Sequence, residues 1–229
     1  MSDTINDDLG CCGWRALIVH EEDLQDGVNA REGPGRVGSI VERGRIEIVA
    51  LVGSMRRHSF NRGLLRTAML LQPEDVRLIE VPVHTLPFFN PDHAGADDIP
   101  LVQDFMQALH RADAVLVCTP EYAGSLPGLL KNALDWASIP TGRSALRGKP
   151  VGLAGASRGR SGTVRAQMHL RSVLSSMGAV VIPEPEVLVT YAEDKFNQLG
   201  ELTDQTSRDL MGQLMVNLTD WAKLLQDQR

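Results

Sequence analysis

The chain has 229 residues, a formal net charge of −6, 43% hydrophobic residues and three cysteines. The net acidic charge argues against a general nucleic-acid binder, which needs a basic surface to neutralise phosphates. Three cysteines cannot form a disulfide framework, and no apolar run approaches the roughly 18 residues of a membrane span. We therefore expect a globular cytoplasmic protein with neither a nucleic-acid nor a membrane partner.

The excess negative charge is concentrated near the N-terminus. Residues 1–45 hold nine acidic and five basic residues, many glycines and one short apolar patch. Such a segment cannot bury enough apolar surface to form a core. We predict an N-terminal extension over residues 1–45, disordered or loosely docked, followed by one domain over residues 46–229.

From residue 46 onward, strands and amphipathic helices alternate. Short β-branched runs predict strands, and apolar residues at helical spacing, closed by proline or glycine, predict helices. Strands are predicted over 46–52, 76–81, 114–118 and 150–154, with a fifth built from 179–182 and 187–189. Helices are predicted over 61–71, 99–111, 127–137 and 163–177, with a long final helix striped by apolar residues over 210–225.

Continuous apolar strands between helices indicate a parallel sheet that is covered on both faces. Ligands of such sheets bind at the carboxyl ends of the strands. The loops that follow Val52, Cys118 and Ala154 are therefore the predicted site. Cys118 itself ends an apolar strand, so we expect a buried, inert thiol rather than a redox nucleophile.

The first loop, residues 53–61, is suited to a phosphate. It carries the hydroxyls of Ser54 and Ser59, the amide of Asn61 and the guanidinium of Arg56. The first N–H groups of the following helix also favour an anion. The loop has neither the glycine pattern of a dinucleotide fold nor that of an NTPase P-loop. Ordinary turn and helix-capping chemistry is the alternative interpretation.

The second and third loops are suited to a planar ring. Two prolines in residues 119–128 favour an extended turn whose backbone polar groups face a neighbour, and Tyr122 offers an amphipathic flank. Small residues over 155–162 allow close backbone approach, and Arg158 adds positive charge. A rigid structural loop and a solvated arginine are the alternatives.

Two motifs carry a family resemblance. The first is Gly53-Ser54-x-Arg56-x-x-Ser59-x-Asn61, and the second runs from Thr119-Pro120-Glu121-Tyr122 to Lys131-Asn132-Ala133-x-Asp135-Trp136. Together they resemble the NADPH-dependent FMN reductase family from about residue 45 to the C-terminus. The resemblance implies an α/β, flavodoxin-like fold, a doubly wound five-stranded parallel sheet with helices on both faces.

The resemblance also assigns site residues by position. The FMN phosphate and ribityl chain would be held by Ser54, Arg56, Ser59, Phe60 and Asn61. The isoalloxazine ring would be bordered by Pro120, Glu121, Tyr122 and Ala123, and on its other side, mainly through backbone, by Ala156 and Ser157. Many members have asparagine at the position of Ala123, so a side-chain amide is missing here while the backbone donor remains.

The implied activity is hydride transfer from NADPH or NADH to bound FMN, then transfer of two electrons to a small acceptor. Quinones, azo compounds, free flavin and metal oxyanions are acceptors in the family. The flavin carries this chemistry, so we predict no catalytic side chain, and no metal-ligand spacing is present. The family implies a homodimer or homotetramer. A non-enzymatic flavodoxin-like electron carrier or sensor, and a reductase that releases reduced FMN, are the alternatives.

Overall fold

The computed structural model describes residues 45–93, 99–139 and 143–226, so the predicted extension lies outside the described residues except for Arg45. The strands are β1 (Ile46–Val52), β2 (Val76–Glu80), β3 (Ala114–Thr119), β4 (Pro150–Ala156), β5 (Val180–Val181) and β6 (Val187–Val189). The α-helices are α1 (Phe60–Leu71), α2 (Pro100–Arg111), α3 (Gly128–Ala137), α4 (Val164–Ser176), α5 (Ala192–Lys195) and α6 (Gln205–Gln226). Two 3₁₀ helices, η1 (Val83–Thr85) and η2 (Pro91–His93), precede α2.

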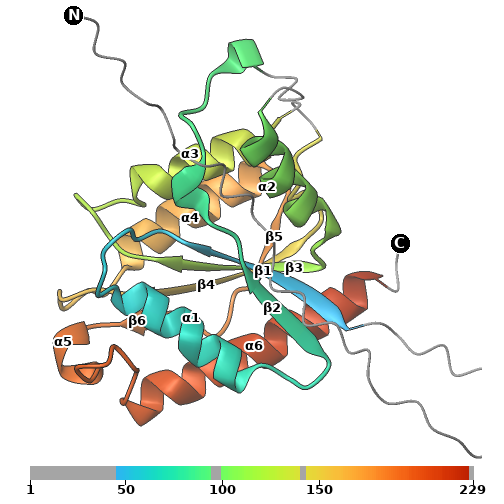
Figure 1. The fold of residues 1–229 in the computed structure, drawn as a ribbon. Helices are drawn as coiled ribbons and strands as arrows, with labels where there is room; N and C mark the ends of the chain where they lie inside the picture. Colours follow the sequence, from blue (N-terminus) through green and yellow to red (C-terminus); the bar gives the residue numbers. More distant parts are fainter. Residues whose placement is uncertain (1–44, 94–98, 140–142, 227–229) are drawn as a thin grey trace, which may run out of the picture. The chain divides into compact units, whose positions relative to one another are not determined.

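The strands form one parallel sheet in the order β2-β1-β3-β4-β5, with β6 also paired to β4 (Figure 1). This is the flavodoxin-like order, so the predicted fold is confirmed. The predicted fifth strand is split into two short segments that both pair with β4. Pro183 and Pro185 lie between them, and proline has no N–H to donate to a sheet ladder.

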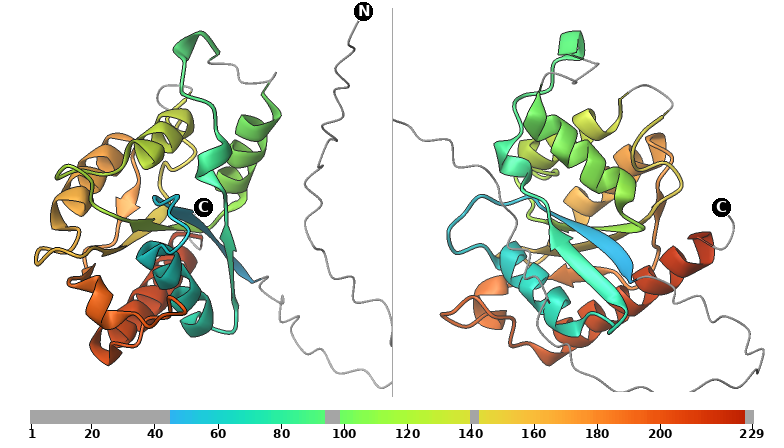
Figure 2. Two further views of the ribbon diagram at one scale, coloured as in Figure 1. Left: turned by 60° about the vertical axis from the view of Figure 1, so that its left-hand side comes forward. Right: turned by 45° about the vertical axis from the view of Figure 1, so that its right-hand side comes forward.

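Helices cover both faces of the sheet, as Figure 2 shows. Alternate residues of β1 point to opposite faces, so Ile48 and Ala50 pack toward α1 and α6, whereas Val49 and Leu51 pack toward α2, α3 and α4. Both clusters are apolar, which explains why the strands read as continuous hydrophobic runs. No helix in the described part of the chain is long and apolar enough to cross a membrane.

Polar side chains fix where the helices begin. The Ser59 hydroxyl accepts a hydrogen bond from the Arg62 N–H at 3.3 Å and so caps α1. The Asp204 carboxylate accepts from the N–H and the hydroxyl of Ser207 at the start of α6. These two bonds are the main cause of the lowered pKa of Asp204. The caps explain why α6 begins five residues before the first apolar residue of its predicted stripe, Leu210.

Cys118 is fully buried on the face of the sheet that packs against α1 and α6. Burial, with a smaller contribution from the negative charge of Glu80, raises the pKa of its thiol to about 12. The predicted buried thiol is confirmed, and its thiolate form is strongly disfavoured at neutral pH.

We therefore predict that Cys118 does not react with thiol reagents in the folded protein. Cys11 and Cys12 lie outside the described residues, so both are replaced by serine to leave one thiol. Near pH 8 only about one thiol in ten thousand would be ionised at such a pKa. The expected result is no labelling under native conditions and one label per chain in denaturant, measured by mass spectrometry. Rapid labelling of the native variant would contradict the buried position.

Candidate active site

A cavity of about 190 Å³ opens at the carboxyl ends of the sheet. These ends lie on the left of Figure 1, where β1, β3 and β4 give way to their loops. Ten of the eleven predicted site residues line the cavity: Ser54, Arg56, Ser59, Phe60, Asn61, Pro120, Glu121, Tyr122, Ala156 and Ser157. Arg158 lines it as well, whereas Ala123 does not. The three predicted loops therefore converge on one site.

One end of the cavity is built for an anion. Ser54 and Ser59 are buried beside the first turn of α1, whose leading N–H groups have no acceptor within the helix. The guanidinium of Arg56 lies 6.0 Å from the centre of the Phe60 ring, so this exposed charge is held over the same turn. Hydroxyls, helix N–H groups and a guanidinium are the donor types that bind phosphate.

Asn61 ties two walls of the cavity together. Its carboxamide donates to the Ala156 carbonyl at 3.0 Å and accepts from the Ala156 N–H at 2.9 Å. Asn61 is buried, and these bonds connect the first turn of α1 to the end of β4. The Asn61 side chain therefore helps to position the cavity wall at Ala156, because its amide oxygen and nitrogen both bond the Ala156 backbone.

Glu121 turns its carboxylate away from the cavity toward the N-terminus of α4. It forms an ion pair with Arg165, whose Nε donates to it at 2.7 Å. It also accepts from the backbone N–H groups of Arg165 and Ala166 at 3.0 and 3.2 Å. The Glu121 side chain is 6% exposed. Its contribution to the cavity wall therefore comes from its backbone, while its charge anchors the loop to α4.

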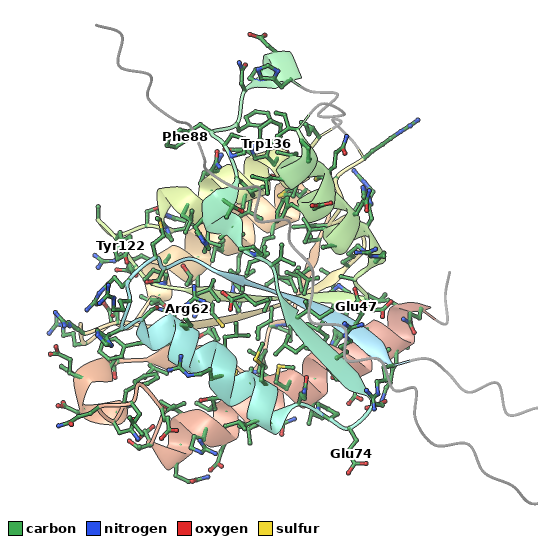
Figure 3. All side chains as sticks on the ribbon, viewed as in Figure 1. Glu47, Arg62, Glu74, Phe88, Tyr122 and Trp136 are labelled. Carbon is green, nitrogen blue, oxygen red and sulfur yellow. The ribbon has the colours of Figure 1, made fainter. Side chains whose placement is uncertain are left out.

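Residues 122–125 form a tight hairpin turn beside this anchor. Tyr122 and Ser125 exchange two backbone hydrogen bonds, of 3.1 and 3.0 Å. Ala123 and Gly124 have φ angles of 49° and 73°, the pattern of a type I′ turn. Tyr122 is 47% exposed, and Figure 3 labels it at the left edge of the molecule, above the first turn of α1.

The N–H groups of Glu121 and Ala123 donate no hydrogen bond within the described part of the chain. Glu121 lines the cavity, so its N–H is available to a ligand there, and Ala123 lies next to the lining residue Tyr122. Because both N–H groups belong to the backbone of an anchored turn, their positions are fixed before any ligand arrives. Two such donors suit the polar edge of a planar ring.

The opposite wall is fully bonded within the protein. The Ser157 N–H donates to the Val189 carbonyl, and the Ser157 carbonyl accepts from the Ala192 N–H, both at 3.0 Å. The Ala156 N–H is used by Asn61. Contacts expected from the backbone of Ala156 and Ser157 would thus be van der Waals contacts rather than N–H donation.

Two charged features of the site have partners that the sequence does not reveal. Arg158 lines the cavity and pairs with Glu193 at 2.8 Å, where α5 follows the short strand β6. Arg165 anchors the loop through Glu121, 44 residues away in the chain. Spacing along a sequence cannot identify such a partner. Within residues 45–93, 99–139 and 143–226 no cluster of potential metal ligands occurs.

Known proteins similar to this chain share its fold and most of its length. A curated NAD(P)H-dependent FMN reductase of Pseudomonas aeruginosa is 36% identical over 181 residues, covering 79% of this chain and 97% of the relative. A 2-hydroxy-1,4-benzoquinone reductase of a Burkholderia species is 36% identical over 178 residues, covering 78% and 97%. The solved flavoenzyme NAD(P)H:(acceptor) oxidoreductase FerB of Paracoccus denitrificans superposes with a TM-score of 0.71 at 30% identity, covering 78% and 97%.

The family model described as NADPH-dependent FMN reductase matches residues 46–194. This stretch contains all eleven predicted site residues and begins with β1. The match confirms the predicted enzyme class, an oxidoreductase, and the predicted pair of FMN and a nicotinamide nucleotide donor. The chain therefore belongs to the NADPH-dependent FMN reductase family.

Proposed function

We propose that this protein transfers a hydride from NAD(P)H to FMN held in the described cavity and then two electrons to a small acceptor such as a quinone. The observation that carries the proposal is the convergence of an anion site and a ring-sized wall at the carboxyl edge of one sheet. FMN, when bound, supplies a group that accepts a hydride from the nicotinamide and passes two electrons on.

The residues present fit this cofactor. Ser54, Ser59 and the first turn of α1, with Arg56 above it, would hold the phosphate. The free N–H of Glu121 would face the polar edge of the ring, with Ala123 next to it in the turn, and Ala156 with Ser157 would pack against the other side of the ring. Asn61 would act by holding Ala156 in place rather than by direct contact alone.

The protein's own part in the reaction is orientation rather than acid–base catalysis. Glu121 is the one acidic residue that lines this cavity, and its carboxylate is engaged by Arg165 and the start of α4. The half-exposed ring of Tyr122 stands at the mouth, where a second planar molecule could stack. These features support successive binding of donor and acceptor at one open face.

A homodimer or homotetramer and a cytoplasmic location remain predictions. The side chain of Phe88 supports an interface between copies of the chain. It is 91% exposed on the segment that joins β2 to α2, and Figure 3 places it at the top of the molecule near Trp136.

The proposed function is tested by absorbance spectroscopy of the purified full-length protein. We expect a yellow protein that bleaches on anaerobic addition of NADPH or NADH and regains its colour when a quinone is added. Bound flavin that neither nucleotide reduces would instead indicate an electron carrier. A colourless protein that does not bind added FMN would refute the proposal.

Replacing Arg56 with alanine should weaken FMN binding. A charge-assisted contact to phosphate contributes roughly 1.5–3 kcal/mol, which corresponds to about a tenfold to hundredfold rise in Kd. Arg77→Ala is the matched control, because Arg77 is an exposed arginine of β2 that lines none of these cavities. Fluorescence titration of the apoprotein with FMN measures both. Equal affinity in the Arg56 variant and the wild type would remove Arg56 from the site.

Replacing Glu121 with alanine should loosen the turn beside the ring. The change removes the partner of Arg165 and of two helix N–H groups, so we expect a loss of about 2 kcal/mol in the free energy of unfolding. FMN affinity should fall as well. Arg165→Ala leaves the bonds from the helix N–H groups intact and should have the smaller effect on both quantities. Urea unfolding and FMN titration provide the measurements, and wild-type FMN affinity in the Glu121 variant would contradict the positioning role.

A further inference from the structure

A second cavity, of about 160 Å³, adjoins the FMN cavity at the first turn of α1. Ser59 and Phe60 line both, so the two cavities are neighbours at this turn. We call the second cavity the Arg57 groove. Its lining residues are Arg57, His58, Ser59, Phe60, Arg66 and the segment 197–200.

The Arg57 groove is positively charged. Arg57 and Arg66 carry guanidinium groups, His58 adds an imidazole, and no carboxylate belongs to the residues that line it. Neither guanidinium forms an ion pair with any residue that the structure describes. Arg66 donates to the Gly200 carbonyl at 2.6 Å, which leaves most of its N–H donors for another partner. Unpaired guanidinium groups on one groove favour a bound anion.

The wall opposite α1 is built before any ligand binds. The Asn197 side-chain oxygen accepts from the N–H groups of Leu199 and Glu201, both at 3.0 Å, and shapes the segment into a turn. A side chain at Gly63 would approach the Gly200 carbonyl to 2.5 Å, so the turn lies directly against α1. Leu199 and Phe60 give the groove apolar surface next to its charges.

We propose that the Arg57 groove binds the 2′-phosphate on the adenosine half of NADPH, so that the enzyme prefers NADPH to NADH. This inference rests on the proposed function, because the nicotinamide of the same molecule must reach the neighbouring FMN cavity. The 2′-phosphate is the chemical difference between the two nucleotides, and it carries close to two negative charges. Two guanidinium groups without a carboxylate partner match that charge, and the apolar surface suits the adjoining adenosine.

The first test is the ratio of kcat/KM for NADPH to kcat/KM for NADH. For the FMN-loaded wild type we expect a ratio well above one. Arg57→Ala should lower the ratio about tenfold, as for loss of one charge-assisted contact. Arg66→Lys should lower it less, because lysine keeps the charge without the planar fork. Arg77→Ala, which removes an exposed arginine elsewhere, should leave the ratio unchanged. A ratio near one in the wild type, or one unmoved by Arg57→Ala, overturns the proposal.

The second test measures binding without turnover. In isothermal titration calorimetry of the FMN-loaded protein, 2′,5′-ADP should bind more tightly than 5′-AMP, and Arg57→Ala should remove the difference. Equal binding of both nucleotides by the wild type overturns the proposal. Failure of the proposed function would be seen in a different experiment. In that case neither NADPH nor NADH would bleach the flavin, whatever the result of the calorimetry. The two ideas can therefore fail separately.

Discussion

The bonds between the Asn61 carboxamide and both backbone groups of Ala156 hold the site together. One end of this contact sits in the first turn of α1, beside the phosphate loop, and the other ends β4. Because the contact is buried, loss of the amide would leave an N–H and a carbonyl without partners, at a cost of roughly 1–3 kcal/mol each. The position of the first turn of α1 relative to the end of β4 therefore depends in part on one side chain.

The fold was predictable because the sheet is parallel and covered on both faces. Most strands are continuous apolar runs, and several helices end near proline or glycine, as α1 does before Pro73 and α4 before Gly178, so periodicity located them to within a few residues. The short elements α5, η1 and η2 escaped prediction because three or four residues carry no period. The split of the fifth strand could have been inferred from Pro183 and Pro185, which interrupt its ladder.

The sequence predicted which residues gather at this cavity but not which partners their side chains bond. Parallel strands bring their carboxyl ends together, so the loops after β1, β3 and β4 had to meet. What each side chain does there depends on partners distant in sequence. The sequence suggested that Glu121 contacts the ring. In the structure its carboxylate instead accepts hydrogen bonds from the backbone and side chain of Arg165 at the start of α4. Net acidity likewise conceals the local positive charge of Arg56, Arg57 and Arg66, which lie close together in the sequence at the start of α1 and within it.

The turn at Ala123 has a consequence for how the ring wall keeps its shape. The left-handed backbone of Ala123, at a φ of 49°, costs about 1–2 kcal/mol of conformational free energy, whereas glycine adopts this conformation freely. Gly124 suits its own position in the turn, but Ala123 does not. The turn is held from outside, by the bonds of Glu121 to a helix on the far side of the loop. The part of the turn that would face the flavin therefore keeps its geometry through the bonds between Glu121 and the start of α4.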